Sequence, residues 1–322
     1  ARALIGEART IGSEGDLATA SRIADEILAK SPDLPQALSL KADLLLSQGK
    51  ADEAMARLAS LVKAAPFDGQ ARFTLISLLI AGNKLAEANE AIEAMRKVLP
   101  QDIRHHYLRA VLAFRQGDPL KARDAVILVL GRIPDHGPSL LLAGAAEYQI
   151  GSLATAADFL RKVLARYPNS LYARNLLIAT YLRQGQPGKA EEVLGPALKQ
   201  APEDATVLRA AGEVAFANNR MPEAANYYNR ALALEKDSAQ LRTRLAQIRL
   251  ANGETERALG DLEAASGLDN RQYQADLSLI STYLGSKQYD KALEAVAKLE
   301  RKQPDNPQTY SVKGTVYLAR QD

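Results

Sequence analysis

The stretch LYARNLLIATYLRQGQPGKAEEVLGPALKQAPED, residues 171–204, decides the fold. Apolar residues recur at the spacing of one helical face in its first half, which predicts a helix over 171–184. Gly185 ends that helix, because glycine readily takes the left-handed conformation of a helix C-cap. A second helix is predicted over 189–200, and Pro202 ends the unit because proline cannot continue a helix. The stretch therefore predicts two antiparallel helices joined by a short turn.

The same pattern recurs along the whole chain with a fixed period of 34 residues. An alanine column contains Ala20, Ala54, Ala88, Ala122, Ala156, Ala190, Ala224, Ala258 and Ala292. A proline column twelve residues further on contains Pro32, Pro66, Pro100, Pro134, Pro168, Pro202 and Pro304, with Lys236 and Asn270 at the two remaining positions. No insertion breaks the register. A strict period of this length indicates a repeat array.

Two of the columns have a direct physical interpretation. The turn column contains Gly15, Gly49, Asn83, Gly117, Gly151, Gly185, Asn219, Gly253 and Lys287. Glycine and asparagine tolerate a positive φ, so this column predicts a tight left-handed turn in each repeat, and only Lys287 departs from the residue pattern. The alanine column predicts the point where the two helices of one repeat approach most closely, because a methyl is the largest group that fits there.

These columns resemble the tetratricopeptide (TPR) repeat, which has a small residue at repeat position 8, Gly at 15, Ala at 20 and Pro at 32. Position 8 reads Ala8, Ala42, Ile76, Ala110, Gly144, Ile178, Gly212, Ala246, Ile280 and Gly314. The three isoleucines depart from the small-residue rule and recur at every third repeat. Two explanations of that spacing stay open: duplication of a three-repeat block, or coincidence. The tryptophan of family position 4 is absent.

The resemblance implies an all-α fold, an α-α superhelix or TPR solenoid, with nine full helix-turn-helix repeats and one further helix. We expect one continuous array over residues 1–322, with repeats at 1–34, 35–68, 69–102, 103–136, 137–170, 171–204, 205–238, 239–272 and 273–306 and a partial repeat at 307–322. Because the chain begins at Ala1 without an initiator methionine, we interpret it as a piece of a longer protein.

Composition excludes several classes of protein. The chain has 41 basic and 38 acidic residues, so its charge gives no reason to expect nucleic-acid binding. It contains no cysteine, which excludes disulfides, thiolate metal sites and a thiol nucleophile. No apolar run approaches the length of a membrane span. We therefore expect no nucleic acid and no direct membrane span in this chain.

Catalytic and cofactor-binding motifs are also lacking. His105 and His106 are adjacent, so on a helix they point about 100° apart and cannot both face one metal ion. We expect these two and His136 on a helix surface and in a loop. The carboxylates show no acid–base pairing, and the glycines are spaced singly rather than gathered in a phosphate-binding loop. We predict no enzyme activity, no metal and no cofactor.

The resemblance implies that the first helices line a concave groove through repeat positions 2, 5, 9, 12 and 13. The candidate groove residues at these positions are Phe73, Arg104, Tyr107, Phe114, Arg115, Leu141, Tyr148, Tyr172, Asn175, Arg183, Arg209 and Phe216. Aromatic residues and arginine are favoured in binding hot spots. Packing between neighbouring helices is the alternative interpretation for the apolar members of the set, and a solvated surface is the alternative for the arginines.

One subset of the TPR family binds a partner's C-terminal carboxylate with Lys at position 5 and Asn at position 9. The pairs at these positions here include Asn175/Ala179, Arg209/Glu213 and Thr243/Gln247, and none of the nine pairs matches. The sequence therefore gives poor support to a chaperone-tail adaptor.

Three functions remain open. The first is a non-catalytic scaffold that binds an extended peptide or a partner's helix in the groove. The second is a scaffold arm of a bacterial envelope system for exopolysaccharide export or protein sorting, since the chain is similar in composition to TPR lipoproteins of those systems; this alternative favours the periplasm or cell envelope. The third is a substrate-recruiting arm of an enzyme whose catalytic domain lies outside this chain.

The last helix adds an expectation about self-association. Val316, Tyr317 and Leu318 look exposed at the end of the array, where repeat proteins usually have a polar surface. End-to-end contact would cover them, so a homodimer is one expected partner arrangement.

Overall fold

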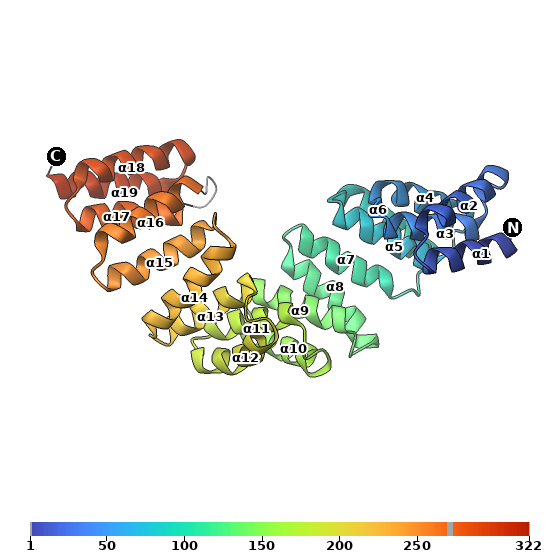
Figure 1. The fold of residues 1–322 in the computed structure, drawn as a ribbon, viewed down its shortest axis with the longest axis horizontal. Helices are drawn as coiled ribbons and strands as arrows, with labels where there is room; N and C mark the ends of the chain where they lie inside the picture. Colours follow the sequence, from blue (N-terminus) through green and yellow to red (C-terminus); the bar gives the residue numbers. More distant parts are fainter. Residues whose placement is uncertain (1, 269–272, 322) are drawn as a thin grey trace. The chain divides into compact units, whose positions relative to one another are not determined.

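The computed structural model describes residues 2–268 and 273–321, and these residues form nineteen α-helices and no β-strand (Figure 1). The predicted all-α class and the helix-pair repeat are confirmed. The odd-numbered helices are the first helix of each repeat (A helices), and the even-numbered helices are the second (B helices). Asn270 of the proline column lies outside the described residues.

The chain divides into two units, Ala1–Arg166 and Tyr167–Asp322. Unit 1 contains α1 Arg2–Ser13, α2 Leu17–Lys30, α3 Pro35–Ser47, α4 Ala51–Ala64, α5 Gly69–Ala81, α6 Leu85–Val98, α7 Arg104–Arg115, α8 Pro119–Arg132, α9 Gly137–Ile150 and α10 Leu153–Arg166. Unit 2 contains α11 Leu171–Arg183, α12 Pro187–Gln200, α13 Ala205–Ala217, α14 Met221–Leu234, α15 Ala239–Ala251, α16 Thr255–Leu268, α17 Gln274–Gly285, α18 Tyr289–Lys302 and α19 Pro307–Arg320. Continuity of the array from unit 1 into unit 2 stays a prediction from the unbroken register.

The helix boundaries follow the local chemistry of the repeat. The α12 helix begins two residues before its predicted start, because Pro187 occupies the first helical turn, where a missing N–H is tolerated. Several A helices begin at a side-chain cap: the Asp204 carboxylate accepts a hydrogen bond from the Val207 amide at 2.9 Å, and Asp68 caps α5 in the same way. These caps satisfy amides that have no partner within the helix.

All nine residues of the turn column have a positive φ, between +56° at Lys287 and +101° at Gly15. The prediction of a left-handed turn is therefore confirmed in every repeat. Lys287 departs in residue type but not in conformation, because the helices on either side fix the turn geometry. A side chain with a Cβ is strained in this conformation, whereas glycine is not.

The nine alanines of the alanine column are all completely buried. Position 8 of the facing A helix is Ala or Gly in seven of its ten occurrences and isoleucine in the other three. A Cβ added to Gly144 would lie 2.9 Å from the Leu160 side chain, and one added to Gly212 would lie 2.4 Å from the ring of Tyr228. At these two crossings there is therefore room for only one large side chain.

Two further features of unit 2 concern its buried groups. The Lys302 ammonium contacts the Asp276 carboxylate at 2.9 Å and donates a hydrogen bond to the Ser266 carbonyl at 2.6 Å, which links α16, α17 and α18.

The expectation that Val316 is exposed is wrong: it is fully buried against the core of α17 and α18, because α19 packs its inner face on α18. Tyr317 and Leu318 are exposed as expected.

We predict that Ala88→Leu lowers the free energy of unfolding by about 1–3 kcal/mol, because three added carbons overpack the closest approach of α5 and α6. Ala86→Leu is the matched control, since Ala86 lies exposed on the same helix and should change stability by less than about 0.5 kcal/mol. Urea unfolding followed by circular dichroism measures both. Equal stability of the two variants would contradict the role assigned to the alanine column.

Candidate functional site

The A helices of unit 2 form a face with three hollows, which we call hollows 1, 2 and 3. Hollow 1 has a volume of about 310 Å³ and lies against α11, α13 and α15. Its apolar wall comes from Tyr172, Leu176 and Leu182, and Asn175 and Arg209 add polar groups. Tyr172 is 61% exposed, so its ring is available at the edge of the hollow.

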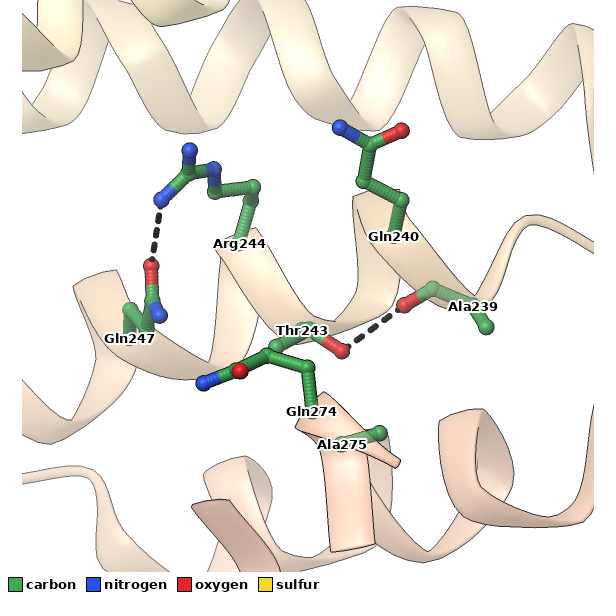
Figure 2. Close-up of a pocket in the computed structure, with 7 residues that line it drawn as sticks. All are labelled: Ala239, Gln240, Thr243, Arg244, Gln247, Gln274 and Ala275. Atoms are coloured by element: carbon green, nitrogen blue, oxygen red, sulfur yellow. Dashed lines mark hydrogen bonds between the residues drawn. The ribbon is translucent and has the colours of Figure 1, made fainter. Parts of the chain in front are cut away.

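Hollows 2 and 3 lie between α15 and α17 and share Gln247 and Gln274. Hollow 2, of about 470 Å³, is lined mainly by polar side chains, which include Gln240, Thr243 and Arg244 (Figure 2). Hollow 3, of about 520 Å³, combines an apolar group (Leu250, Leu262 and Leu277) with a row of hydroxyl groups (Thr255, Ser278, Ser281, Thr282 and Ser286). Together hollows 2 and 3 form one cleft along the two helices, which we call the α15–α17 cleft.

The lining of the hollows follows the repeat register. Most of the A-helix residues that line them occupy repeat positions 2, 5, 9 and 12, as Tyr172, Asn175, Ala179 and Leu182 do in hollow 1. Position 6 lines them as well, through Leu176, Ala210, Arg244 and Ser278. Position 6 is not among the groove positions 2, 5, 9, 12 and 13 that the family resemblance implies.

A chain of polar contacts fixes one wall of the α15–α17 cleft. The Arg244 guanidinium donates to both carboxylate oxygens of Glu213, at 2.7 and 2.9 Å. Its Nη1 donates to Gln247 Oε1 at 3.0 Å, and Figure 2 draws this hydrogen bond to Gln247. The same guanidinium lies 5.7 Å from the centre of the Phe216 ring. Arg244 is therefore held by Glu213, Gln247 and Phe216.

Tyr228 lies near the same carboxylate. Burial, with the charge of Glu213 beside it, raises the pKa of Tyr228 and keeps that phenol neutral.

Two predicted site residues of unit 1, Phe73 and Tyr107, form an aromatic row with His136. The rings of Phe73 and Tyr107 are stacked with centroids 6.3 Å apart, and Tyr107 meets His136 edge-on at 5.5 Å. His136 caps α9, and its Nδ1 lies 2.7 Å from the Ser139 hydroxyl. Burial raises the pKa of Tyr107, so its phenol stays neutral at physiological pH. The row crosses α5, α7 and the start of α9.

Five other predicted residues fall into two groups: the apolar and aromatic ones are half-buried, and the two arginines are exposed. Phe114 is half-buried and packs against Ala113, Ala122 and Ala146, and Leu141 and Tyr148 are half-buried on α9. Arg115 and Arg183 are exposed. Half-burial places Phe114 between the two interpretations of the apolar stripe, because its side chain both packs on these alanines and keeps some exposure.

Two of the predicted arginines are engaged within the protein. Arg104 binds Asp102 through two nitrogens, at 2.9 and 2.6 Å, and donates to Gln70 Oε1 at 3.1 Å. The contact with Asp102 lowers the pKa of that carboxyl and raises that of the guanidinium. Arg209 pairs with Glu235 at 3.7 Å. Neither arginine is arranged as an anion site.

The histidine expectation needs one correction. His105 is buried rather than on a helix surface, because it lies in the first turn of α7 and faces back toward the Pro100 carbonyl, 3.4 Å from its Nε2. Over the described ranges 2–268 and 273–321, no three His, Asp or Glu side chains gather in a way that could hold a metal ion. In the same ranges, no helix has both the length and the apolar character to cross a membrane.

Sequence reasoning missed the residues that define the α15–α17 cleft, namely Gln240, Arg244, Gln247 and Gln274. The available signal was the recurrence of glutamine at position 2 in three successive repeats, Gln240, Gln274 and Gln308. The hot-spot preference for aromatic residues and arginine does not point to glutamine. The position of Arg244 depends on its partners on two helices, which periodicity does not reveal.

Three models of the tetratricopeptide repeat match this chain, at residues 13–72 and 249–314, at 73–138 and 177–239, and at 139–170. The chain belongs to the tetratricopeptide repeat family. Its fold supports a general role as a protein-interaction scaffold. Its fold is similar to that of the Cut9–Hcn1 hetero-tetramer of the APC/C, with a TM-score of 0.63 and 16% identity over 94% of this chain and 59% of the other.

Two bacterial relatives share part of the sequence of this TPR protein. Cellulose synthase operon protein C of Pseudomonas fluorescens is 24% identical over 60% of this chain and 13% of its own length. Protein FlbA of Caulobacter vibrioides is 27% identical over 49% of this chain and 27% of its own length. The matches therefore span about a quarter or less of each relative.

We predict that Phe114→Ala lowers the free energy of unfolding by about 2 kcal/mol, below the 3–5 kcal/mol of a fully buried phenylalanine, because only part of its ring packs. Arg115→Ala, at the exposed neighbouring position, is the control and should stay within about 0.5 kcal/mol of the wild type. Thermal and urea unfolding measure both variants. A loss above about 3 kcal/mol would assign Phe114 to packing alone.

Proposed function

We propose that this TPR protein is a non-catalytic scaffold that binds an extended peptide or a partner's helix on the face of its A helices. The main support for this proposal is that the three hollows of unit 2 are lined largely by side chains from the same repeat positions of successive A helices. A ligand that follows this face meets equivalent positions in each repeat. Repeat arrays offer extended binding surfaces of this kind.

The composition of the face supports a protein ligand over an anionic one. Tyr172 and the aromatic row of unit 1 provide rigid apolar contact area, which interfaces favour. Arg104 and Arg209 are engaged by Asp102 and Glu235. Binding of nucleic acid would require cations that are available to phosphates. The absence of nucleic acid, like end-to-end dimerisation through α19, remains a prediction.

Site-specific photocross-linking in cells tests the proposal. A benzophenone amino acid at Arg115 in unit 1 or at Tyr172 in unit 2 should give discrete adducts with a protein partner, because both side chains are exposed on A helices. Leu128 on α8 and Asn229 on α14 are matched controls, because each is exposed on a B helix of the same unit. The same adducts at equal yield from both sets of positions would contradict binding on the A-helix face.

A second candidate function is a scaffold arm in a bacterial envelope system for exopolysaccharide export or protein sorting. The supporting observation is the similarity to cellulose synthase operon protein C over 60% of this chain. In that case the A-helix face would bind another protein of the export system, and the protein would act in the periplasm or at the cell envelope.

Fractionation of cells that express the complete gene tests this second candidate. We expect the protein in the periplasmic or membrane fraction, with a protease-accessible TPR region after the outer membrane is permeabilised. A cytoplasmic marker enzyme is the control for lysis. Recovery of the protein with that marker would exclude the envelope function and leave the scaffold proposal intact.

A further inference from the structure

The α15–α17 cleft offers hydrogen bonds without a net charge. Arg244 is the charged side chain among its described lining residues, and its guanidinium is already bound by Glu213 and Gln247. The remaining polar lining consists of carboxamides and hydroxyls. A charged ligand group would lose its hydration there without gaining an opposite charge. The cleft therefore favours an uncharged polar ligand.

The orientation of the Gln247 carboxamide is fixed by its neighbour. A guanidinium has donors and no acceptor, so the group that faces Arg244 at 3.0 Å is the Gln247 oxygen. The Gln247 Nε2 then points away from Arg244, which leaves its N–H groups directed away from the guanidinium (Figure 2). Glu213, by holding Arg244 with two hydrogen bonds, positions this donor before any ligand arrives.

Two threonines present the opposite kind of group. Thr243 donates its hydroxyl hydrogen to the Ala239 carbonyl at 2.8 Å, and Thr282 donates to the Ser278 carbonyl at 2.7 Å. Each hydroxyl oxygen is left with acceptor capacity only. The cleft thus combines a fixed donor at Gln247 with fixed acceptors on both helices, and in hollow 3 the half-buried Leu250 and Leu277 offer apolar surface.

We infer that the α15–α17 cleft binds an uncharged extended peptide segment, whose backbone carbonyl accepts a hydrogen bond from Gln247 and whose aliphatic side chain packs on the half-buried Leu250 and Leu277. This inference rests on the proposed scaffold function and names the ligand class for unit 2. An extended backbone leaves both its N–H and C=O groups available, whereas a helix satisfies them internally. An oligosaccharide would lack the aromatic platform that such ligands stack on, since the described lining of hollows 2 and 3 contains no aromatic side chain.

The length of the cleft sets the length of the segment. Its wall on α15 extends from Ala239 to Leu250, which is about 17 Å at 1.5 Å per helical residue. An extended peptide advances about 3.3–3.6 Å per residue, so about five residues occupy the cleft. We therefore expect a five-residue uncharged core with one aliphatic anchor toward hollow 3.

A selection experiment tests this inference on the whole 322-residue chain. A phage-displayed library of random decapeptides is selected on the immobilised protein, and an enriched peptide is synthesised with a fluorophore for polarisation measurements. We expect an uncharged core with an aliphatic residue. Gln247→Ala should raise the Kd about tenfold through loss of the donor, and Glu213→Gln about threefold through loss of its positioning. Gln36→Ala, at an exposed A-helix position of unit 1, is the control and should leave the Kd unchanged.

Amide-to-ester replacement in the peptide distinguishes recognition of the peptide backbone by Gln247 from a purely structural role of Gln247. The replacement removes one N–H and weakens the adjoining carbonyl as an acceptor, so at the contacting position it should lower affinity for the wild type. The same replacement should lower the affinity of Gln247→Ala by less, because the weakened carbonyl has already lost its partner there. Circular dichroism confirms that each variant is folded, and an unchanged Kd for a folded Gln247→Ala variant would overturn the inference.

The remaining outcomes separate this inference from the scaffold proposal. Enriched peptides with charged cores, or peptides that depend on Phe73 and Tyr107 but not on Gln247, overturn the cleft assignment and leave the scaffold function standing. Binding of cellohexaose that is sensitive to Gln247→Ala, without peptide binding, would assign the cleft to a glycan and overturn the inference. Failure to enrich any peptide also overturns it, and the scaffold proposal fails only if cross-linking from the A and B helices is equal as well.

Discussion

The close approach of the two helices in each repeat is the constraint on which the rest of the structure depends. Nine alanines at this crossing have no solvent exposure, and at two crossings a glycine at position 8 faces a large side chain, Gly144 facing Leu160 and Gly212 facing Tyr228. Interiors of proteins are close-packed, so one added methylene at such a contact must displace a helix. The spacing of the A helices, and with it the width of every hollow on their face, follows from this crossing.

The polar residues of the α15–α17 cleft show how a repetitive scaffold acquires a local specificity. Most repeats follow the same backbone plan, yet Glu213, Arg244 and Gln247 form one connected set across α13 and α15. A carboxylate, a guanidinium and a carboxamide in series neutralise the charge and leave a single oriented donor toward the cleft. Recognition in this protein is thus a property of particular side chains placed on a common backbone.

The fold was predictable from the sequence in nearly all its parts. The 34-residue period, the glycine and asparagine turns and the prolines gave the helix pairs, and even Lys287 takes the left-handed turn that its column requires. The candidate site was predictable only in outline. Repeat positions 2, 5, 9 and 12 do line the hollows, but position 6 does so too, and Val316 and His105 are buried although both were expected at the surface. Their burial depends on which neighbouring helix covers them, and a single repeat does not carry that information.

The sequence by itself determined the architecture, because each repeat makes the same local choices of helix, turn and closest contact, and these choices depend on residues near one another in the chain. Tertiary structure decided which polar groups remain available for a ligand. Arg104 and Arg209 look like binding residues in the sequence, yet each is engaged by a carboxylate within the protein. Gln247 looks unremarkable in the sequence, but Arg244 aims its carboxamide into the cleft. Hydrogen-bond capacity depends on partners from other helices, so it emerges only when the repeats are packed together.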